Sequence, residues 1–207
     1  MIGTETIGSY LDRLASHDPT PGGGAAGAVH AAQAAALIGM VARFTTGKRF
    51  TAYQPEVTDI CVAADAQVQT ALQLAEADET AFQQVIAAYR LPKSTDQAVT
   101  ERSQAIQTAL VAAAAPPQRL VAVAADIVAL GERLVEFGNP NVISDVAAAA
   151  EAARAAAATA RVNIEINLTG LTDADRAAPL HQSVAEADDV IHAAEALASR
   201  VRRQIRE

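Results

Sequence analysis

Hydrophobic residues recur at helical spacing along most of the chain, and proline, glycine and polar residues separate these stretches into helices. A short amphipathic helix is indicated first, by the spacing of Ile7, Tyr10, Leu11 and Leu14. After a proline-containing turn over residues 17–21, a run from residue 25 to about residue 45 is apolar nearly all the way round. Such a helix is typical of the centre of a bundle, where other helices surround it.

A long helix is predicted next, from about residue 55 to residue 89, and a proline-containing segment ends it. Ser94 or Thr95 can cap the helix that follows. We expect Pro116 and Pro117 to kink or break that helix, because proline lacks the N–H group that the helical hydrogen-bond ladder requires.

Two more helices complete the pattern. The turn at residues 137–141 is a strong stop signal, and an alanine-rich helix resumes from Val142 to Leu168. Residues 162–168 alternate as a strand would, but no other segment of the chain reads as a partner strand. A cap at residues 172–175 opens the last helix. The sequence therefore predicts an all-α fold, a single-domain bundle of six to seven helices with a central buried Ala-rich helix, formed by residues 1–207.

Composition supports closely packed helices and narrows the choice of partners. Hydrophobic residues make up 51% of the chain, almost half of them alanine, and aromatic residues only 3%. Alanine is the best helix former, and its small side chain lets helices approach closely. The net charge of -8 argues against a general binder of nucleic acid or of anionic membranes, since both need a basic surface. We expect no nucleic-acid partner and no membrane partner.

Cysteine usage and the N-terminus indicate the compartment. Cys61 is the single cysteine and cannot form an intrachain disulfide, which suits a reducing environment. Residues 1–5 lack the basic start and apolar run of a signal peptide. The run over residues 25–42 carries His30 and Gln33 and is too weakly hydrophobic to be assigned as a membrane span. We expect a cytoplasmic protein.

The loop before the central helix is the first candidate for chemistry. It contains Pro21, Gly22, Gly23 and Gly24. The first N–H groups of a helix lack partners within the helix and favour anionic or carbonyl oxygens, and three glycines permit close approach. A flexible turn or a helix-packing contact explains the glycines as well. The loop is not a phosphate-binding or dinucleotide motif, because the lysine and the preceding strand are absent.

Two further segments could carry chemistry. Asn139, Asn141 and Asp145 gather at one helix start, where they could orient a polar heterocycle or simply cap the helix. Asp78 and Glu79 lie beside an Ala-Phe pair on a helix, so a carboxylate against apolar surface could titrate near neutrality. An exposed acidic helix face is the plain alternative.

Metal chemistry finds little support. Four residues form one loose cluster of acids and histidines: His181, Asp188, Asp189 and His192. A di-iron bundle needs paired Glu-x-x-His motifs on two helices and two more carboxylates. We therefore predict no metal site.

Several of these segments follow one another in a characteristic order. They are Thr20 to Gly24, Met40 to Ala42, Thr46 to Lys48, Asp78 to Phe82, Leu91 to Lys93, Gly138 to Asp145 and Arg161 to Leu168. Together the series resembles the cyclodeaminase/cyclohydrolase family, which includes formiminotetrahydrofolate cyclodeaminases, the cyclodeaminase domain of formiminotransferase-cyclodeaminase and a class of methenyltetrahydrofolate cyclohydrolases. The resemblance spans about residues 5 to 200.

The resemblance implies a helical, homodimeric enzyme that acts on the one-carbon group between nitrogens 5 and 10 of tetrahydrofolate. The activity would be that of a formiminotetrahydrofolate cyclodeaminase, an ammonia lyase, or of a methenyltetrahydrofolate cyclohydrolase. It implies a folate substrate and no cofactor beyond the tetrahydrofolate derivative used as substrate. Both reactions pass through a tetrahedral carbon, so both need a group that shuttles protons.

The resemblance also implies roles for single residues. Asp78 would be the general acid/base, and the glycine loop would lie against the folate. Asn139, Asn141 and Asp145 match the family's polar turn and would hydrogen-bond the pterin or the reacting nitrogens. Lys48 would meet a glutamate carboxylate of the folate tail, an assignment that rests on its charge.

Two positions depart from the family pattern. Ala25 stands where serine commonly follows the glycines, and His30 is unusual in that helix start. These changes could alter the choice of substrate or mark a relative that has lost activity. The alternative function is a non-catalytic helical binding or assembly module on the same fold, in which Asp78 would be exposed and its pKa unperturbed.

Overall fold

Helices make up almost all of the structure. The computed structural model describes residues 2–207, and within that range it contains six α-helices, three short 3-10 helices and no strand. The α-helices are α1 (Ile7–Leu14), α2 (Gly23–Phe44), α3 (Gln54–Tyr89), α4 (Asp96–Phe137), α5 (Ser144–Thr169) and α6 (Ala174–Gln204). The 3-10 helices are η1 (Ile2–Thr4), η2 (Lys48–Tyr53) and η3 (Pro140–Val142). The prediction of an all-α fold is confirmed, including a helix over residues 162–168.

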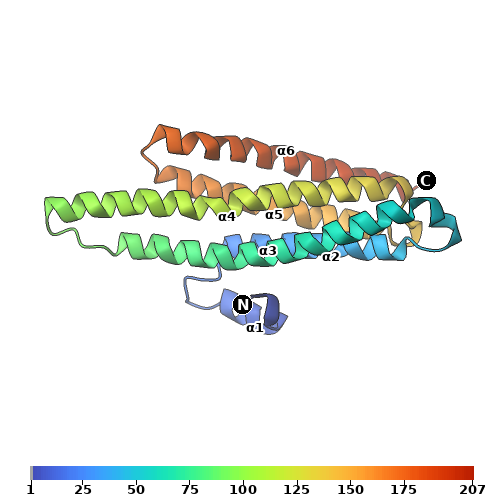
Figure 1. Cartoon of the computed structure of the whole chain (residues 1–207), viewed down its shortest axis with the longest axis horizontal. Coiled ribbons are helices and arrows are strands. Elements are labelled where there is room, and N and C mark those ends of the chain that lie inside the picture. Colours follow the sequence, from blue (N-terminus) through green and yellow to red (C-terminus); the bar gives the residue numbers. More distant parts are fainter. Residues whose placement is uncertain (1) are drawn as a thin grey trace.

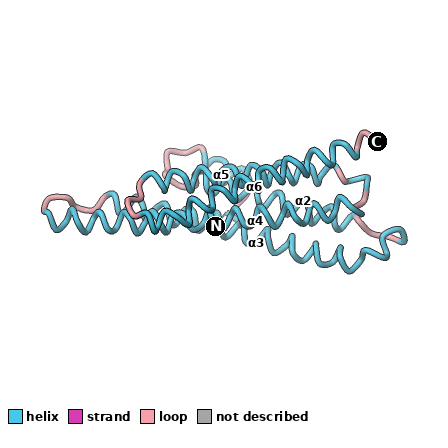
Figure 2. Tube along the Cα trace, turned by 90° about the horizontal axis from the view of Figure 1, so that it is seen from above, coloured by secondary structure: helices cyan, strands magenta, loops and turns pink. Residues whose placement is uncertain are grey.

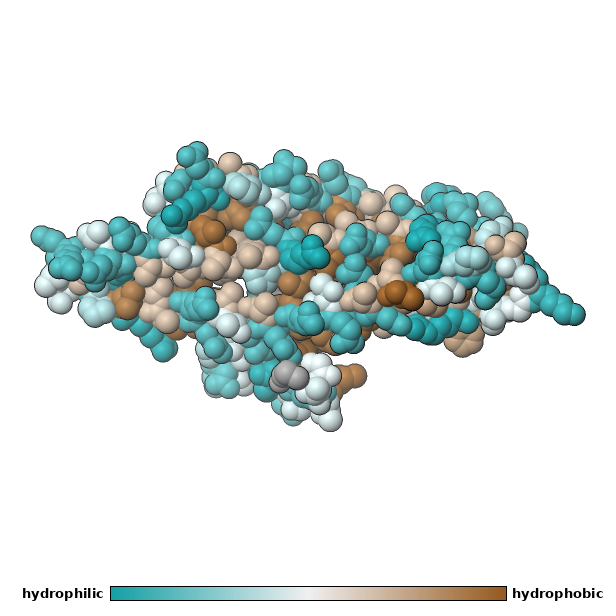
Figure 3. All heavy atoms as spheres, viewed as in Figure 1, coloured by the Kyte–Doolittle hydropathy of each residue, from teal (hydrophilic) through white to brown (hydrophobic). Residues whose placement is uncertain are grey.

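The five long helices form an elongated bundle. Helices α2 to α6 run along its long axis, and the short helix α1 lies apart from them, on the side of α3 (Figure 1). The view from above shows the same elongation, with most connecting loops gathered at the two ends (Figure 2). On the face drawn in Figure 3, hydrophilic side chains gather at both ends, and weakly hydrophobic surface is exposed between them.

Helix α2 lies at the centre of the bundle and packs against α3, α4 and α5. Its buried residues are mostly alanine and glycine. A β-carbon on Gly27 would come within 2.9 Å of the Thr159 side chain, so α2 and α5 approach too closely for a larger residue there. By length and composition α2 could cross a membrane, but 61% of its most apolar window is buried within the bundle. That burial is typical of a core helix.

Helix α4 continues through Pro116 and Pro117, so the break that the sequence suggested does not occur. Both prolines are buried, and α4 packs against α2, α3, α5 and α6. The two missing N–H groups cost backbone hydrogen bonds, and the packing of α4 against these helices offsets that cost. The cap at Thr95 is confirmed, because its hydroxyl accepts a hydrogen bond from the N–H of Ala98 (3.1 Å). Helix α6 is capped within the predicted residues 172–175, but by Asp173 and not by Thr172, which the capping pattern placed first.

A second hydrophobic cluster lies apart from the main core, between the C-terminal half of α3 and the N-terminal half of α4. It consists of Ala81, Val85, Ala88, Ile106, Ala109, Leu110 and Ala113. We call this pair of half-helices the α3–α4 hairpin. The hairpin extends beyond the end of α2, and the side chains of this cluster hold its two half-helices together (Figure 1).

Candidate active site

The glycine loop and the carboxylate of Asp78 meet at the first turn of α2. Gly22 precedes this helix in an extended conformation, and no side chain caps the helix start. A β-carbon on Gly24 would overlap Oδ1 of Asp78 and lie 2.6 Å from its Oδ2. The backbone N–H of Ala25 donates a hydrogen bond to the same carboxylate. The first turn of α2 therefore receives a carboxylate from α3 directly against its backbone.

The surroundings of Asp78 favour its protonated form. Burial is the largest effect and raises the pKa of this carboxyl group, and the nearby charge of Glu79 raises the pKa further. The hydrogen bond from Ala25 acts in the opposite direction but does not cancel the rise. An acid whose pKa moves toward neutrality is better matched to both accepting and donating protons.

Helix α1 supplies a cation to the neighbour of Asp78. The guanidinium of Arg13 donates hydrogen bonds to Glu5 (2.9 Å) and to Glu79 (3.2 Å). The side chain of Glu79 is only 17% exposed, so this ion pair is shielded from solvent on the acidic side. Arg13 thereby ties α1 to α3 next to the candidate catalytic group and offsets part of the charge that Asp78 experiences.

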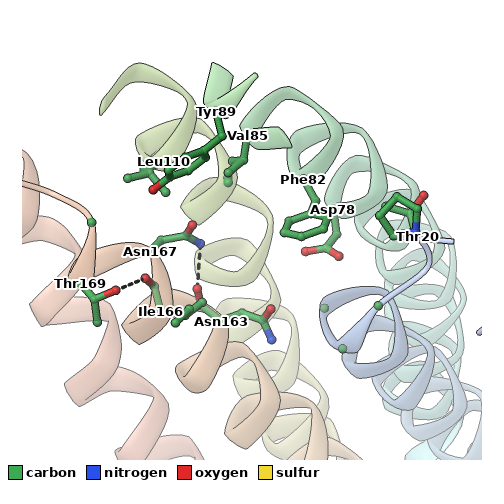
Figure 4. A pocket seen from close by; sticks show the side chains of 16 residues that line it. Thr20, Asp78, Phe82, Val85, Tyr89, Leu110, Asn163, Ile166, Asn167 and Thr169 are labelled. Atoms are coloured by element: carbon green, nitrogen blue, oxygen red, sulfur yellow. Dashed lines mark hydrogen bonds between the residues drawn. The ribbon is translucent and has the colours of Figure 1, made fainter. Parts of the chain in front are cut away.

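A cavity of about 460 Å³ opens in front of Asp78. It lies between the glycine loop, the α3–α4 hairpin and the end of α5 (Figure 4). The lining residues are Pro19, Thr20, Gly22, Gly23, Gly24, Asp78, Phe82, Val85, Tyr89, Leu110, Ala113, Asn163, Ile166, Asn167, Thr169 and Gly170. Among these residues Asp78 is the only carboxylate, and none is a cation. A mostly apolar pocket with one proton-exchanging group suits acid/base chemistry on a neutral or cationic centre.

The far wall of the cavity is fixed by a side chain of α4. The amide of Gln107 donates to the carbonyl of Gly170 (2.8 Å) and accepts from the N–H of Thr172 (2.9 Å). Gly170 lies against Leu110 so closely that a β-carbon there would come within 2.6 Å of it. Gln107 therefore holds the α5–α6 loop against the hairpin and keeps that end of the cavity in shape.

Part of the predicted site is brought together at this cavity. Asp78, Gly22, Gly23 and Gly24 line it, while Pro21 is buried beside them and does not line it. Asp78 is half-buried and its pKa is raised, which differs from what a non-catalytic module would show.

The remaining predicted site residues lie at the other end of α2. Lys48 begins η2. Asn139 caps η3, Asn141 lies within η3, and Asp145 lies in the first turn of α5. Helix α2 has 22 residues, so its ends are about 30 Å apart at the usual rise per residue. Within one chain these four residues therefore do not share the cavity with Asp78. Their part in substrate binding stays a prediction, and it would require a second chain.

The structure gives Asn139 a local role that the sequence left open. Its side-chain amide donates to the carbonyl of Phe44 (2.7 Å), and its backbone N–H donates to the hydroxyl of Thr45 (3.1 Å). Its side-chain oxygen accepts from the N–H of Asn141 (3.1 Å). Asn139 thus caps η3 and joins it to the end of α2.

The two positions that depart from the family pattern differ in placement. The side chain of Ala25 is fully buried, and its N–H group is the one that binds Asp78. His30 is exposed on α2 and does not line the cavity. A change at residue 30 therefore lies outside the site. A change at residue 25 lies within it, because the backbone of this residue contacts Asp78.

Several cavity residues were not predicted as site residues: Thr20, Phe82, Tyr89, Asn163 and Asn167. Phe82 lies one helical turn beyond Asp78, so helical spacing alone would have placed it on the same face. Asn163 and Asn167 are spaced four apart on an otherwise alanine-rich helix, which is also a readable signal. No group of three or more metal-ligating side chains occurs within residues 2–207.

Comparison with known proteins agrees with this geometry. A model of the formiminotransferase-cyclodeaminase family matches residues 6–186. Methenyltetrahydrofolate cyclohydrolase from Methylorubrum extorquens is 38% identical over 84% of this chain and 84% of its own length. Formimidoyltransferase-cyclodeaminase from Rattus norvegicus is 30% identical over 81% of this chain, which spans only 31% of the rat protein. The crystal structure of formiminotetrahydrofolate cyclodeaminase from Thermotoga maritima matches with a TM-score of 0.87 and 31% identity, over 100% of this chain and 98% of that one.

Proposed function

The chain belongs to the formiminotransferase-cyclodeaminase family, and on that basis we propose that it is a methenyltetrahydrofolate cyclohydrolase in which Asp78 shuttles the proton. Its relatives and fold make it a folate one-carbon enzyme with cyclodeaminase or cyclohydrolase activity, and the alternative of a non-catalytic module is not favoured. Hydrolysis is the first choice because a cyclohydrolase matches most of the chain at 38% identity. The position of the Asp78 carboxylate against the first turn of α2 is the observation that carries the mechanism.

The proton transfers of cyclohydrolysis suit a single carboxyl group. Water attacks the methenyl carbon, and the ionised carboxylate of Asp78 accepts a proton from that water, which leaves a neutral tetrahedral carbon bearing a hydroxyl group. The bond from this carbon to nitrogen 5 then breaks, Asp78 donates its proton to nitrogen 5, and the hydroxyl loses its proton to solvent. The product is 10-formyltetrahydrofolate, and one proton is released overall. A raised pKa for Asp78 suits both halves of this cycle.

Cyclodeamination is the second candidate, and the similarity to the Thermotoga maritima structure favours it. In that reaction nitrogen 10 attacks the formimino carbon of 5-formiminotetrahydrofolate and ammonia leaves. The proton lost by nitrogen 10 must reach the departing amine, so the same carboxyl group could carry it. The two activities differ in the group that adds to or leaves the carbon, and they share the cavity and the proton shuttle.

An absorbance assay of the methenyl chromophore separates the two activities. We expect the purified protein to accelerate loss of the 5,10-methenyltetrahydrofolate absorbance. Asp78→Asn should lower that rate by about 10² to 10⁴, the usual contribution of a positioned acid/base. Asp189→Asn, on the exposed surface of α6, is the matched control and should keep full activity. Formation of the chromophore from 5-formiminotetrahydrofolate, with no accelerated loss, would replace the first candidate by the second.

The same proposal extends to assembly and location. Residues 1–207 act as one domain, the enzyme is a homodimer in the cytoplasm, and the reaction uses no cofactor beyond the tetrahydrofolate derivative. Dimer formation is supported by the alanine-lined outer groove between α3 and α4, which includes Ala77, Ala81, Ala112 and Ala115. Light scattering in solution tests the dimer directly, and a monomer would refute it.

A homodimer could also bring the distant polar residues to the site. Lys48 and Asn141 can reach the cavity only if they come from a second chain, given the length of α2. If they do, mixing an inactive Asp78→Asn protein with an impaired Lys48→Ala protein, and allowing subunits to exchange, restores activity in the mixed dimers. Full activity of Lys48→Ala alone would remove this residue from the site.

A further inference from the structure

We propose that Asn163 and Asn167 determine substrate specificity by accepting hydrogen bonds, through their side-chain oxygens, from the N–H edge of the reduced pterin ring. This inference rests on the proposed function, because it names how the same cavity recognises its folate. It adds a recognition surface on α5 to the proton shuttle on α3.

The two asparagines form a short polar row on α5. They lie four residues apart, which places them one above the other on the same side of the helix. Both side chains are half-buried and both line the cavity. A β-carbon on Gly23 would lie 3.9 Å from the amide nitrogen of Asn163, so this asparagine stands next to the glycine loop. Asn167 continues the row away from that loop (Figure 4).

The amide nitrogens of this row are already engaged by their own helix. That of Asn163 donates to the carbonyl of Thr159, and that of Asn167 donates to the carbonyl of Asn163, each at 2.8 Å. Within residues 2–207 no group donates a hydrogen bond to either amide oxygen. Figure 4 shows the hydrogen bond from the amide nitrogen of Asn167 to the carbonyl of Asn163 as a dashed line. The row therefore presents two amide oxygens that accept no hydrogen bond within the described residues, while one of the two N–H groups of each amide is already used by the helix.

The opposite wall is built for a flat ring. Phe82 and Tyr89 lie two helical turns apart on α3, and they are 46% and 49% exposed although they face a cavity. Val85 and Leu110 add apolar surface between them. Stacking on a planar group is favourable for an aromatic side chain, so this wall can bind the face of a flat ring. The asparagines of α5 can then hydrogen-bond to the edge of the same ring.

Together these features select a neutral, planar heterocycle with N–H donors along one edge. The reduced pterin ring carries such donors at its 2-amino group, at nitrogen 3 and at nitrogen 8. A ring without these donors would leave two half-buried amide oxygens unpaired, which costs binding energy. A site that hydrogen-bonds its ligand in this way rejects analogues that lack the donors much more strongly than an apolar pocket can.

The test compares variants that keep or remove the acceptor. 5-Formyltetrahydrofolate is a stable reduced folate, and its dissociation constant can be measured by calorimetry alongside KM and kcat for 5,10-methenyltetrahydrofolate. Asn163→Leu and Asn167→Leu should each weaken binding and raise KM about tenfold or more. Asn167→Asp keeps an acceptor and should retain most of the affinity. Val162→Ala, on the exposed surface of the same helix and away from the cavity, should bind as the unaltered protein does.

The outcomes separate this inference from the proposed function. If the unaltered protein binds and converts its folate and the folded leucine variants do so equally well, the recognition by Asn163 and Asn167 is refuted and the enzyme assignment stands. Equal weakening by Val162→Ala would also refute it, since the effect would then be structural. If the unaltered protein neither binds nor converts any tetrahydrofolate derivative, both proposals fail. Where leucine impairs folding, Asn167→Ser serves instead, because its hydroxyl can bond to the carbonyl one turn back.

Discussion

The carboxylate of Asp78 occupies the space that a β-carbon on Gly24 would need. These residues are far apart in the sequence, and their contact joins α3 to the first turn of α2. The contact explains why a glycine is required at this position of a helix start, where alanine would otherwise be preferred. It also means that small changes in the loop act directly on the candidate catalytic group.

Gly24→Ala should therefore abolish most activity while the protein stays folded. The new methyl group must displace the end of the Asp78 side chain, and misplacing a catalytic group by about 1 Å can cost about 10² in rate. The change in the free energy of unfolding should stay within about 1 kcal/mol, because alanine favours the helix. Steady-state kinetics and urea unfolding measure the two effects. Gly23→Ala, whose β-carbon meets only Asn163 at 3.9 Å, should lose much less activity, and equal losses would contradict the proposed contact.

The raised pKa of Asp78 has a consequence for stability as well as for rate. The folded state holds the proton of this carboxyl group more tightly than the unfolded chain does, so ionising it costs stability as the pH rises through the unfolded pKa toward the folded pKa. Asp78→Asn should then melt a few degrees higher than the unaltered protein at neutral pH. The difference should shrink as the pH falls below the unfolded pKa of about 3.9. A lower melting temperature for Asp78→Asn at neutral pH would contradict the assigned direction.

The ion pair between Arg13 and Glu79 should tune the pH profile. Removing the cation in Arg13→Gln leaves the charge of Glu79 uncompensated, so the pKa of Asp78 rises and the acid limb of kcat/KM moves to higher pH. Removing the anion in Glu79→Gln should move the same limb to lower pH. The pH dependence of kcat/KM, measured for both variants, gives opposite shifts if Asp78 is the titrating group. Because Arg13 is 39% exposed, solvent screens its ion pair and its loss should change the stability of the protein little.

Gln107 should matter for substrate binding although it does not line the cavity. Gln107→Ala releases the carbonyl of Gly170 and the N–H of Thr172, and we expect faster amide hydrogen exchange in the α5–α6 loop and a severalfold higher KM. The proton shuttle is untouched, so kcat should change little. Gln104→Ala, on the exposed surface of α4, serves as the control. Unchanged exchange in the loop would show that these hydrogen bonds do not hold it.

Periodicity and caps were enough to predict most of the helices, because each depends on residues close together in the chain. Thr95 and Asp173 begin their helices as their residue types suggest. Pro116 and Pro117 could not be judged in this way, since the packing that keeps α4 continuous comes from helices distant in sequence. Local patterns report backbone preferences, and tertiary burial can override them.

The candidate site was predictable only in part for the same reason. Asp78 and the glycines were found through motifs, but which face of α5 lies opposite them depends on how the helices are aligned, which periodicity does not give. Asn163 and Asn167 therefore went unassigned. The separation of Asn139 from Asp78 follows from the 22 residues of α2 between the two ends, and only the completed bundle shows that nothing folds back across that length.

The α3–α4 hairpin carries a further consequence for how a ligand could enter. Its seven-residue hydrophobic cluster is separate from the main core, and four of its members are alanines. Few buried apolar contacts mean a low free energy of local opening, so we expect this hairpin to open more often than the main core does. The part of the cavity wall that bears Phe82 and Tyr89 can therefore open locally while the main core stays folded. Thermal fluctuations can exchange the contents of the cavity far more often than the protein as a whole unfolds.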